Sequence, residues 1–456
     1  MNRNRLATLA VFLLLQRFLT LVAFPHIALQ PDSPSYSQPG WLNFHQVSLL
    51  GHSPRGWVAP LLFALAPGNV GRELLQMLIS VAAWCLAYVE FSFFIKKDRH
   101  KTLFAFGIAI LATSSSVVQW ETVLLGASFQ ISTILLINAL VMRLLRERKN
   151  TKALVAIEIL LFLLAIQKSS NLIFSGLTLF GVIALIWRYS PVMKKIAVSL
   201  SATLIIFVAF LTGANVDKAW PTTYSGYTLL WQLGGQSPTA TEFKNFLSQR
   251  TAVPTCVYQE APYQDLNVSI GKAVNQCKGG AKYVTNGLRS DFIRFVLTHP
   301  QSDLKLASLG FGAALTDSSS HYGPSVQFAP HFLSSIFFGE VKPDHRFSQA
   351  SSQVDAFKLI GSGEPLWLYA PGIAWALVGL AGPIYFRRKQ IEFSYTLGLM
   401  QINLLINSLF VFVILPSEWV RQSAPFMYSS ILLGLFSAVY ILSESTHGEK
   451  QLLIES

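Results

Sequence analysis

Hydrophobic runs that approach or reach the length of a membrane span recur along this chain, separated mostly by short polar connections. They lie near residues 6–27, 74–95, 102–118, 123–142, 153–167, 172–187, 196–213, 366–386, 394–415 and 423–442. About 20 apolar residues in a helix cross the hydrocarbon core of a bilayer. The run at 153–167 is short, so we expect it to extend into its polar flanks. The pattern predicts an all-α polytopic membrane protein with about ten transmembrane helices.

Two polar segments are long enough to carry a function, residues 28–72 and residues 214–365. The first contains the apolar stretch 57–66, which is too short to span and is interrupted by Pro60, so it predicts an interfacial or re-entrant helix. The second is punctuated by Gly, Ser and Pro and predicts a mixed external subdomain. The expected organisation is a seven-helix module (1–213), this subdomain (214–365), and three helices with a tail (366–456).

The composition is 52% hydrophobic and 13% charged, and the net charge is +12. A soluble domain carries about 25% charged residues, so lipid must be much of the solvent. Most of the positive charge flanks the hydrophobic runs on one side of the predicted bundle. The residues on that side are Arg3, Arg5, Lys96, Lys97, Arg99, Lys101, Arg143, Arg146, Arg148, Lys149, Lys152, Arg188, Lys194, Lys195, Arg387, Arg388, Lys389 and Lys450.

The short connections of the opposite face carry only Arg55, Arg72, Lys168 and Arg421. Because cytoplasmic connections retain Lys and Arg, both termini are expected in the cytoplasm and both long polar segments outside it. The first run resembles the start of a signal peptide, but it is too long for one and we interpret it as a retained anchor. The charge therefore indicates orientation in a cell membrane and does not require a nucleic-acid partner.

Cys256 and Cys277 lie together in the second polar segment, on the side where disulfides persist, and we expect them to be bonded. Cys85 falls within a predicted helix and is expected to be a plain core residue. The chain has no Cys/His spacing typical of zinc and no phosphate-binding glycine loop or nucleophile elbow. Nucleotide-driven transport and those hydrolytic chemistries therefore lose support.

Two acids fall on the expected external face. Asp32, in Pro31-Asp32-Ser33, follows the first run, and Glu121 occupies the short turn Gln119-Trp120-Glu121-Thr122. A partly desolvated carboxylate there could act as a general base or pair with a cation. The simpler alternatives are an Asp that caps a loop turn and a solvated Glu beside an interfacial Trp.

Cations repeat on the same face at Arg55, Lys168 and Arg421. They could clamp an anionic headgroup, because a charge-assisted hydrogen bond is about twice as strong as a neutral one. Each could instead simply reach toward lipid phosphates. Arg17 differs because it lies within the first run, where facing lipid is costly, so it should face the bundle or extend outward.

These motifs, in this order, resemble the GT-C superfamily of membrane glycosyltransferases. An early Asp in Asp32-Ser33-Pro34-Ser35-Tyr36 is followed by Ser53-Pro54-Arg55-Gly56-Trp57-Val58-Ala59-Pro60, which resembles the Arg-x-Pro-Gly-Tyr-Pro stretch of that superfamily. The turn at 119–122 resembles its acidic turn, and Lys168-Ser169-Ser170-Asn171 resembles an Arg-x-x-Asn turn with Lys in place of Arg. The similarity extends to poorly characterised bacterial members with a His-Pro step in a late loop, here His299-Pro300.

The resemblance implies transfer of a sugar from a polyprenyl-phosphate donor to a glycan, lipid or protein acceptor, with inversion, on the extracytoplasmic face. Asp32 would be the general base, Glu121 would assist or position it, and Arg55, Lys168 and Arg421 would bind the phosphate. The isolated Asp32 argues against a two-carboxylate metal site, so no obligatory metal or other cofactor is expected, although some members use a divalent cation.

Three alternatives remain open from the residues. A transporter or lipid flippase would need a central polar path, and the predicted helices offer few ionisable groups beyond Arg17, Glu90 and Glu158. An O-antigen polymerase or ligase also acts on lipid-linked sugars and has a large late loop, but the early Asp32 favours the glycosyltransferase. A noncatalytic scaffold whose late loop binds a partner is the third alternative.

Overall fold

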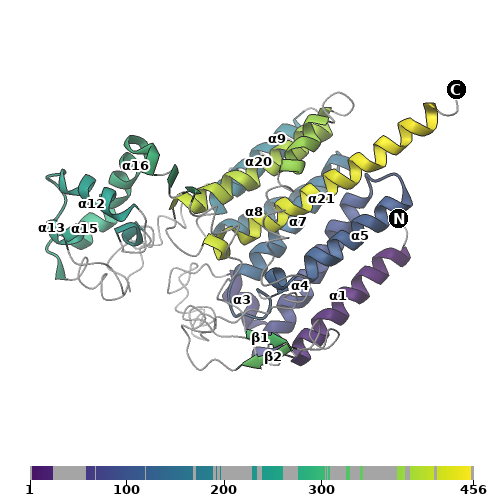
Figure 1. Cartoon of the computed structure of the whole chain (residues 1–456), viewed down its shortest axis with the longest axis horizontal. Coiled ribbons are helices and arrows are strands. Elements are labelled where there is room, and N and C mark those ends of the chain that lie inside the picture. Colours follow the sequence, from purple (N-terminus) through teal and green to yellow (C-terminus); the bar gives the residue numbers. More distant parts are fainter. Residues whose placement is uncertain are drawn as a thin grey trace.

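Long helices packed side by side form most of the computed structural model, and a smaller helical subdomain lies at one end of them (Figure 1). The structure describes residues 3–23, 58–66, 68–118, 120–167, 171–187, 192, 196, 229–233, 239–259, 276–302, 304–305, 307–308, 325–328, 339–342, 377–385, 391–414 and 419–452.

The bundle is built from helices that fall on the predicted hydrophobic runs. They are α1 (Arg3–Ala23), α4 (Gly68–Ser92), α5 (Asp98–Thr113), the short α6 (Ser115–Val118), α7 (Ala127–Arg146), α8 (Thr151–Gln167), α9 (Asn171–Ile186), α20 (Ile391–Ile414) and α21 (Trp419–Leu452). Among the described residues, five helices (α1, α4, α7, α20 and α21) are long and apolar enough to cross a membrane. The protein is therefore a helical polytopic membrane protein, as predicted. The number of ten spans stays a prediction, because residues 197–213 lie outside the described residues.

Helix α7 forms the centre of the bundle and α1 its edge. Of the best spanning window of each helix, 83% is buried in α7 and 28% in α1. Apolar residues at helical spacing on α4, α5 and α21 meet in an aromatic core, where the ring of Phe436 lies 5.0 Å from Phe91 and 5.8 Å from Phe104. The outer face of α1, with Val11, Phe18 and Val22, stays exposed, as expected for a helix bordered by lipid.

Helices α4, α5, α7, α8 and α9 are joined by short connections and run alternately up and down, as do α20 and α21, so polar and charged residues gather at the two ends of the bundle. We call the end that holds Arg5, Asp98, Arg146 and Glu392 the terminal end, because both chain termini lie there (Figure 1). The opposite end, which holds Arg17, Glu121 and Asn171, is called the loop end. Residues 24–57, with Asp32, connect α1 to the next described helix from the loop end.

Residues 57–66 were predicted to form an interfacial or re-entrant helix, and α3 (Val58–Ala64) lies within that range. Pro60 stands in its first turn, where the missing N–H costs no hydrogen bond. The helix packs on the turn before α7 through Ala59, Phe63, Leu124 and Phe129. It therefore lies against the bundle at the loop end.

The helical subdomain comprises a 3-10 turn at Trp231–Leu233, α12 (Ala240–Ser248), α13 (Thr255–Gln259), α15 (Gly280–Asn286) and α16 (Leu288–Thr298). It has a hydrophobic core of its own around Phe243, Val284 and Phe295. Two short antiparallel strands also occur, β1 (Ser325–Phe328) and β2 (Gly339–Lys342), with Ser325 opposite Lys342. The described part of segment 214–365 thus combines a helical unit with one strand pair.

Candidate functional site at the loop end

A buried ion pair joins Arg17 on α1 to Glu121 in the turn between α6 and α7. The Nη2 and Nε atoms of Arg17 donate to Oε1 and Oε2 of Glu121 at 2.7 and 2.9 Å. Arg17 is 2% exposed and Glu121 1%. Arg17 therefore faces the bundle, one of the two orientations expected for it, and Glu121 is not the solvated residue that the simpler alternative required.

Further hydrogen bonds complete the surroundings of this pair. Arg17 Nη2 also donates to the carbonyl oxygen of Ala112 at 2.8 Å, and the hydroxyl of Ser80 donates to Glu121 Oε1 at 2.6 Å. Gln76 Nε2 donates to the carbonyl oxygens of Glu121 and Val123 at 3.0 and 3.1 Å. Burial raises the pKa of the Glu121 carboxyl, and Arg17 opposes that rise. The pair thus fixes α1, α4, the end of α5 and the acidic turn to one another.

Glu73 adds a second carboxyl to this cluster, and it was not among the residues predicted from the sequence. It lies one turn before Gln76 and two turns before Ser80, on the same face of α4. It is 0% exposed, and neither of its carboxylate oxygens has a hydrogen-bond partner among the described residues. A buried carboxyl without a partner is costly, so such groups are concentrated where ligands bind or chemistry occurs. The sequence does contain a pattern that could have identified it, because Glu73, Gln76 and Ser80 are spaced to share one face at the start of an apolar helix.

The acidic turn is held in place from two sides. Trp120 is fully buried, so it packs in the bundle and is not an interfacial anchor. The ring of Phe63 on α3 lies 5.0 Å from that of Phe129 on α7, and Arg72 Nε donates to the carbonyl oxygen of Phe63 at 3.3 Å. Helix α3, which begins three residues after Arg55, is therefore packed directly beside the turn that carries Glu121.

Amides connect the neighbouring helix ends beside Lys168. Gln130 Nε2 on α7 donates to Oδ1 of Asn171 at 2.6 Å, and Asn171 Nδ2 donates to the carbonyl oxygen of Leu164 at 3.0 Å. Gln167 Nε2 donates to the carbonyl oxygen of Gly126 at 2.6 Å. The Asn of the Lys168-Ser169-Ser170-Asn171 motif is thus fully buried and joins α7, α8 and α9 at the loop end.

The structure describes only some of the predicted site residues. Asp32, Arg55 and Lys168 lie outside the described residues, so their predicted roles remain predictions. Arg421 belongs to the first turn of α21, whose start lies at the loop end. Within the described part of the chain, no group of three or more His, Cys, Asp or Glu side chains could hold a metal ion.

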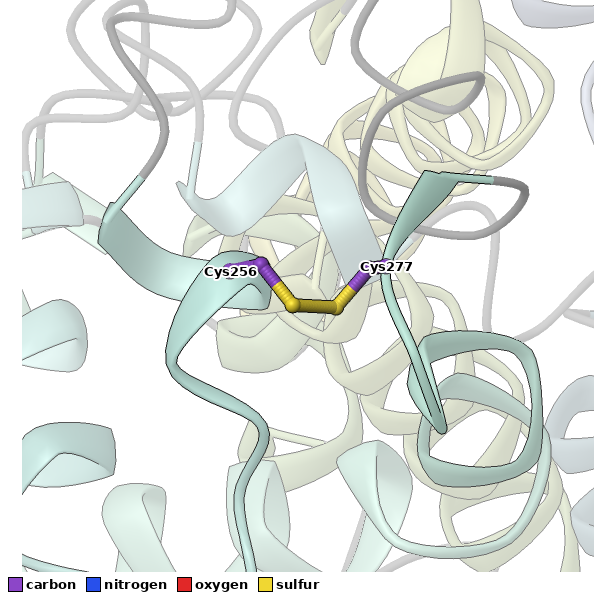
Figure 2. Close-up of a disulfide and its surroundings, with 2 residues drawn as sticks. All are labelled: Cys256 and Cys277. Atoms are coloured by element: carbon purple, nitrogen blue, oxygen red, sulfur yellow. A yellow bond between two sulfur atoms is a disulfide. The ribbon is translucent and has the colours of Figure 1, made fainter.

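Cys256 and Cys277, the predicted disulfide pair, are bonded, with their Cα atoms 5.7 Å apart. Figure 2 shows the bridge connecting α13 to the chain just before α15. Nearby, Tyr283 donates its hydroxyl to Asp291 Oδ2 at 2.9 Å, and Arg250 pairs with Asp291 Oδ1 at 3.1 Å. Burial and the charge of Asp291 raise the pKa of the Tyr283 phenol. These groups stabilise the helical subdomain.

No family model matches the chain, and no curated protein matches it. Three solved structures are similar. Two are of the oligosaccharyltransferase of Archaeoglobus fulgidus, one of AglB with an inhibitory peptide and a dolichol-phosphate and one in the apo form. Each shares 12% sequence identity with this chain, and the TM-scores are 0.41 and 0.43. Each match covers 98% of this chain and 51% of the archaeal chain. ArnT of Cupriavidus metallidurans, bound to undecaprenyl phosphate, is 11% identical, with a TM-score of 0.32, over 95% of this chain and 78% of that one. The chain thus spans about half the length of the archaeal protein.

Proposed function

We propose that the chain is an inverting membrane glycosyltransferase of the GT-C type, which moves a sugar from a polyprenyl phosphate to an acceptor on the extracytoplasmic face. The observation that carries this proposal is the buried polar cluster at the loop end, formed by Arg17, Glu73, Gln76, Ser80 and Glu121. Ionisable groups inside a membrane bundle are expensive and mark functional positions. The cluster adjoins the helix ends from which the chain leaves toward Asp32 and returns from Arg55.

The proposed reaction is a single displacement. The carboxylate of Asp32 takes the proton of an acceptor hydroxyl, and the acceptor oxygen forms a bond to the anomeric carbon. The bond between that carbon and the phosphate oxygen breaks, and the polyprenyl phosphate leaves with the electron pair. Attack opposite the leaving group inverts the configuration. Arg55, Lys168 and Arg421 would stabilise the negative charge as it develops on the phosphate.

The contacts of Glu121 favour one of the two roles expected for it. Both of its carboxylate oxygens accept hydrogen bonds from Arg17, so the group has little capacity left to exchange a proton with a substrate. We therefore assign Glu121 a positioning role, in which it fixes the end of α1 relative to the turn. Glu73 retains free acceptor capacity among the described residues and could accept hydrogen bonds from sugar hydroxyls.

A transfer assay with the purified full-length protein tests the proposal. Radiolabelled polyprenyl-phosphate sugars are offered with glycan, lipid and protein acceptors, and the wild type is compared with Asp32→Asn. Because general-base catalysis contributes about 10²- to 10⁴-fold, the variant should lose that factor in rate while keeping the fold. Asp98→Asn is the matched control, since Asp98 is an exposed acid at the terminal end, and its rate should equal that of the wild type.

Three results separate the alternatives. Equal transfer by Asp32→Asn would remove Asp32 as the base. Transbilayer movement of the lipid without transfer would replace the enzyme with a flippase. Extension of a lipid-linked glycan by whole repeat units, without use of single-sugar donors, would indicate a polymerase or ligase.

A further inference from the structure

A hollow of about 550 Å³ opens at the terminal end of the bundle, between α4, α5 and α7. Its lining includes Glu90, Phe93, Lys101, Arg143, Arg146 and Glu147. It lies at the opposite end of α4 and α7 from the candidate site, and no step of the proposed transfer uses it. The charged residues of the hollow therefore have no role in the proposed transfer.

The two acids of the hollow both lie within ion-pair distance of Arg146, although Glu90 Oε2 accepts no hydrogen bond from the described residues. Arg146 Nη1 lies 2.9 Å from Glu90 Oε2, and Arg146 Nη2 lies 2.6 Å from Glu147 Oε1. The amide of Asn150 donates to the other oxygen of Glu147 at 2.6 Å. Arg146 therefore lies within ion-pair distance of both carboxylates.

Three cations, Lys101, Arg143 and Arg146, thus line the hollow with two carboxylates, which leaves one positive charge in excess. Arg143 Nε stands 3.8 Å from a carboxylate oxygen of Glu90 and 3.8 Å from one of Glu147, which is too long for a hydrogen bond. This Nε atom has no hydrogen-bond partner among the described residues. Lys101 forms no ion pair with any residue that the structure describes. The hollow therefore has a net positive charge, and Arg143 keeps one donor, its Nε–H, without a partner in the described part of the chain.

The rim of the hollow is apolar and continues onto the outer surface of the bundle. The ring of Phe93 is 60% exposed, with the guanidinium carbon of Arg146 4.3 Å from its centroid. Tyr88 and Val89 of α4 also line the hollow. A ligand that fits both surfaces carries a phosphate next to hydrocarbon chains.

We propose that this hollow binds the phosphate of an anionic phospholipid, held by Lys101 and Arg143, with the acyl chains along Phe93. Charge-assisted bonds from Lys and Arg are the strong contacts available to a phosphate, and basic pockets between membrane helices bind such headgroups. A free phosphate ion shares this chemistry but gains nothing from the apolar rim. The two sources are therefore distinguishable.

Native mass spectrometry of the purified full-length protein tests the assignment, with phosphatidylglycerol, phosphatidylcholine or inorganic phosphate added. The wild type should retain phosphatidylglycerol in preference to phosphatidylcholine. Lys101→Gln/Arg143→Gln should weaken phosphatidylglycerol binding about 25-fold, since each cation near a lipid surface contributes about fivefold. The charge-preserving variant Lys101→Arg/Arg143→Lys should retain the lipid, which separates loss of charge from misfolding.

The matched control is Arg99→Gln/Lys152→Gln, which removes two exposed cations from the same end outside the hollow and should leave binding within twofold of the wild type. Equal retention of the two lipids by the wild type would overturn the proposal, as would equal losses in the two glutamine variants. Complete displacement of the lipid by inorganic phosphate at equal concentration would overturn the lipid assignment in favour of a free anion.

Discussion

Arg17 and Glu121 show how one pair of side chains determines the arrangement at the loop end. Removing two ions from water is expensive, and their attraction offsets the cost only when their hydrogen bonds are complete. Here two contacts join the ions, and Ala112 and Ser80 provide further bonds. The main effect of the pair on stability is therefore expected to be the free-energy cost of leaving one partner buried without the other.

Single replacements of the pair should destabilise the protein more than the double replacement. Arg17→Met and Glu121→Met should each lower the free energy of unfolding by about 3–5 kcal/mol, because an unpaired ion or donor set stays buried. Arg17→Met/Glu121→Met should recover most of that loss, since no buried charge remains. Chemical unfolding in mixed micelles measures all three.

The exposed pair Arg5–Asp98 is the matched control, and Arg5→Met/Asp98→Asn should leave unfolding nearly unchanged. Additive losses in the Arg17→Met/Glu121→Met cycle would show that the two groups act independently and would contradict their assignment as one positioning unit.

The membrane bundle and the helical subdomain are stabilised by different interactions. The bundle relies on apolar helix faces, whereas the helical subdomain has a small core, a buried Tyr283–Asp291–Arg250 cluster and one disulfide. Small cores rarely provide enough hydrophobic burial on their own and are commonly stapled. The disulfide should therefore be essential to this subdomain and irrelevant to the bundle.

Cys256→Ser/Cys277→Ser should reduce the stability of the subdomain by about 3 kcal/mol, through the chain entropy that the bridge removes from the unfolded state. Limited proteolysis should cleave within residues 239–302 at least tenfold faster, while the bundle fragments remain intact. Cys85→Ser, in α4, should leave the cleavage rate of the subdomain unchanged. Unaltered cleavage in the double variant would mean that the helices hold without the bridge.

The two ends of the bundle differ in the kind of side-chain contacts that they carry. The terminal end carries ion pairs between neighbouring helices, with Arg148 2.6 Å from Glu392 and Lys96 3.0 Å from Glu444. The loop end carries the buried network and adjoins the long connections. Lys and Arg in short connections mark the cytoplasmic side, so the terminal end is expected inside the cell and the candidate site outside.

Labelling of single cysteines with a membrane-impermeant reagent tests this orientation, in a background in which Cys85 is replaced by Ser. A cysteine introduced by Ser290→Cys, in the exposed part of α16, should react in intact cells. One introduced by Lys152→Cys, at the start of α8, should react only after the membrane is opened. The reverse pattern would put Asp32 in the cytoplasm and would remove the donor on which the proposed reaction depends.

The hydrophobic pattern predicted the course of the helices better than their ends. Helix α4 was expected from residue 74 but begins at Gly68, because Arg72 and Glu73 look like connection residues and yet lie within its first turns. Helix α21 was expected to end near 442 but continues to Leu452. Apolar runs report where lipid or core surrounds a helix, and helical hydrogen bonding continues beyond that limit.

The candidate site was predicted only in part. Glu121 was identified because an acid in a short turn stands out locally, and Arg17 because a charge inside an apolar run does. Their pairing across 104 positions could not be derived, since it depends on how α1 packs against α4 and α5. Glu73 was overlooked for the same reason, because its burial depends on which face of α4 meets the turn.

The distance in sequence between Arg17 and Glu121 also bears on how the protein is made. During synthesis, the arginine emerges 104 residues before its carboxylate, an interval of about 5 to 20 seconds at ordinary elongation rates. Until then the first helix has no internal counter-ion, and lodging it in lipid would leave a bare guanidinium in hydrocarbon. Docking of α1 is thus coupled to the arrival of a later turn, and this helix can settle at the edge of the bundle only after that turn has been inserted.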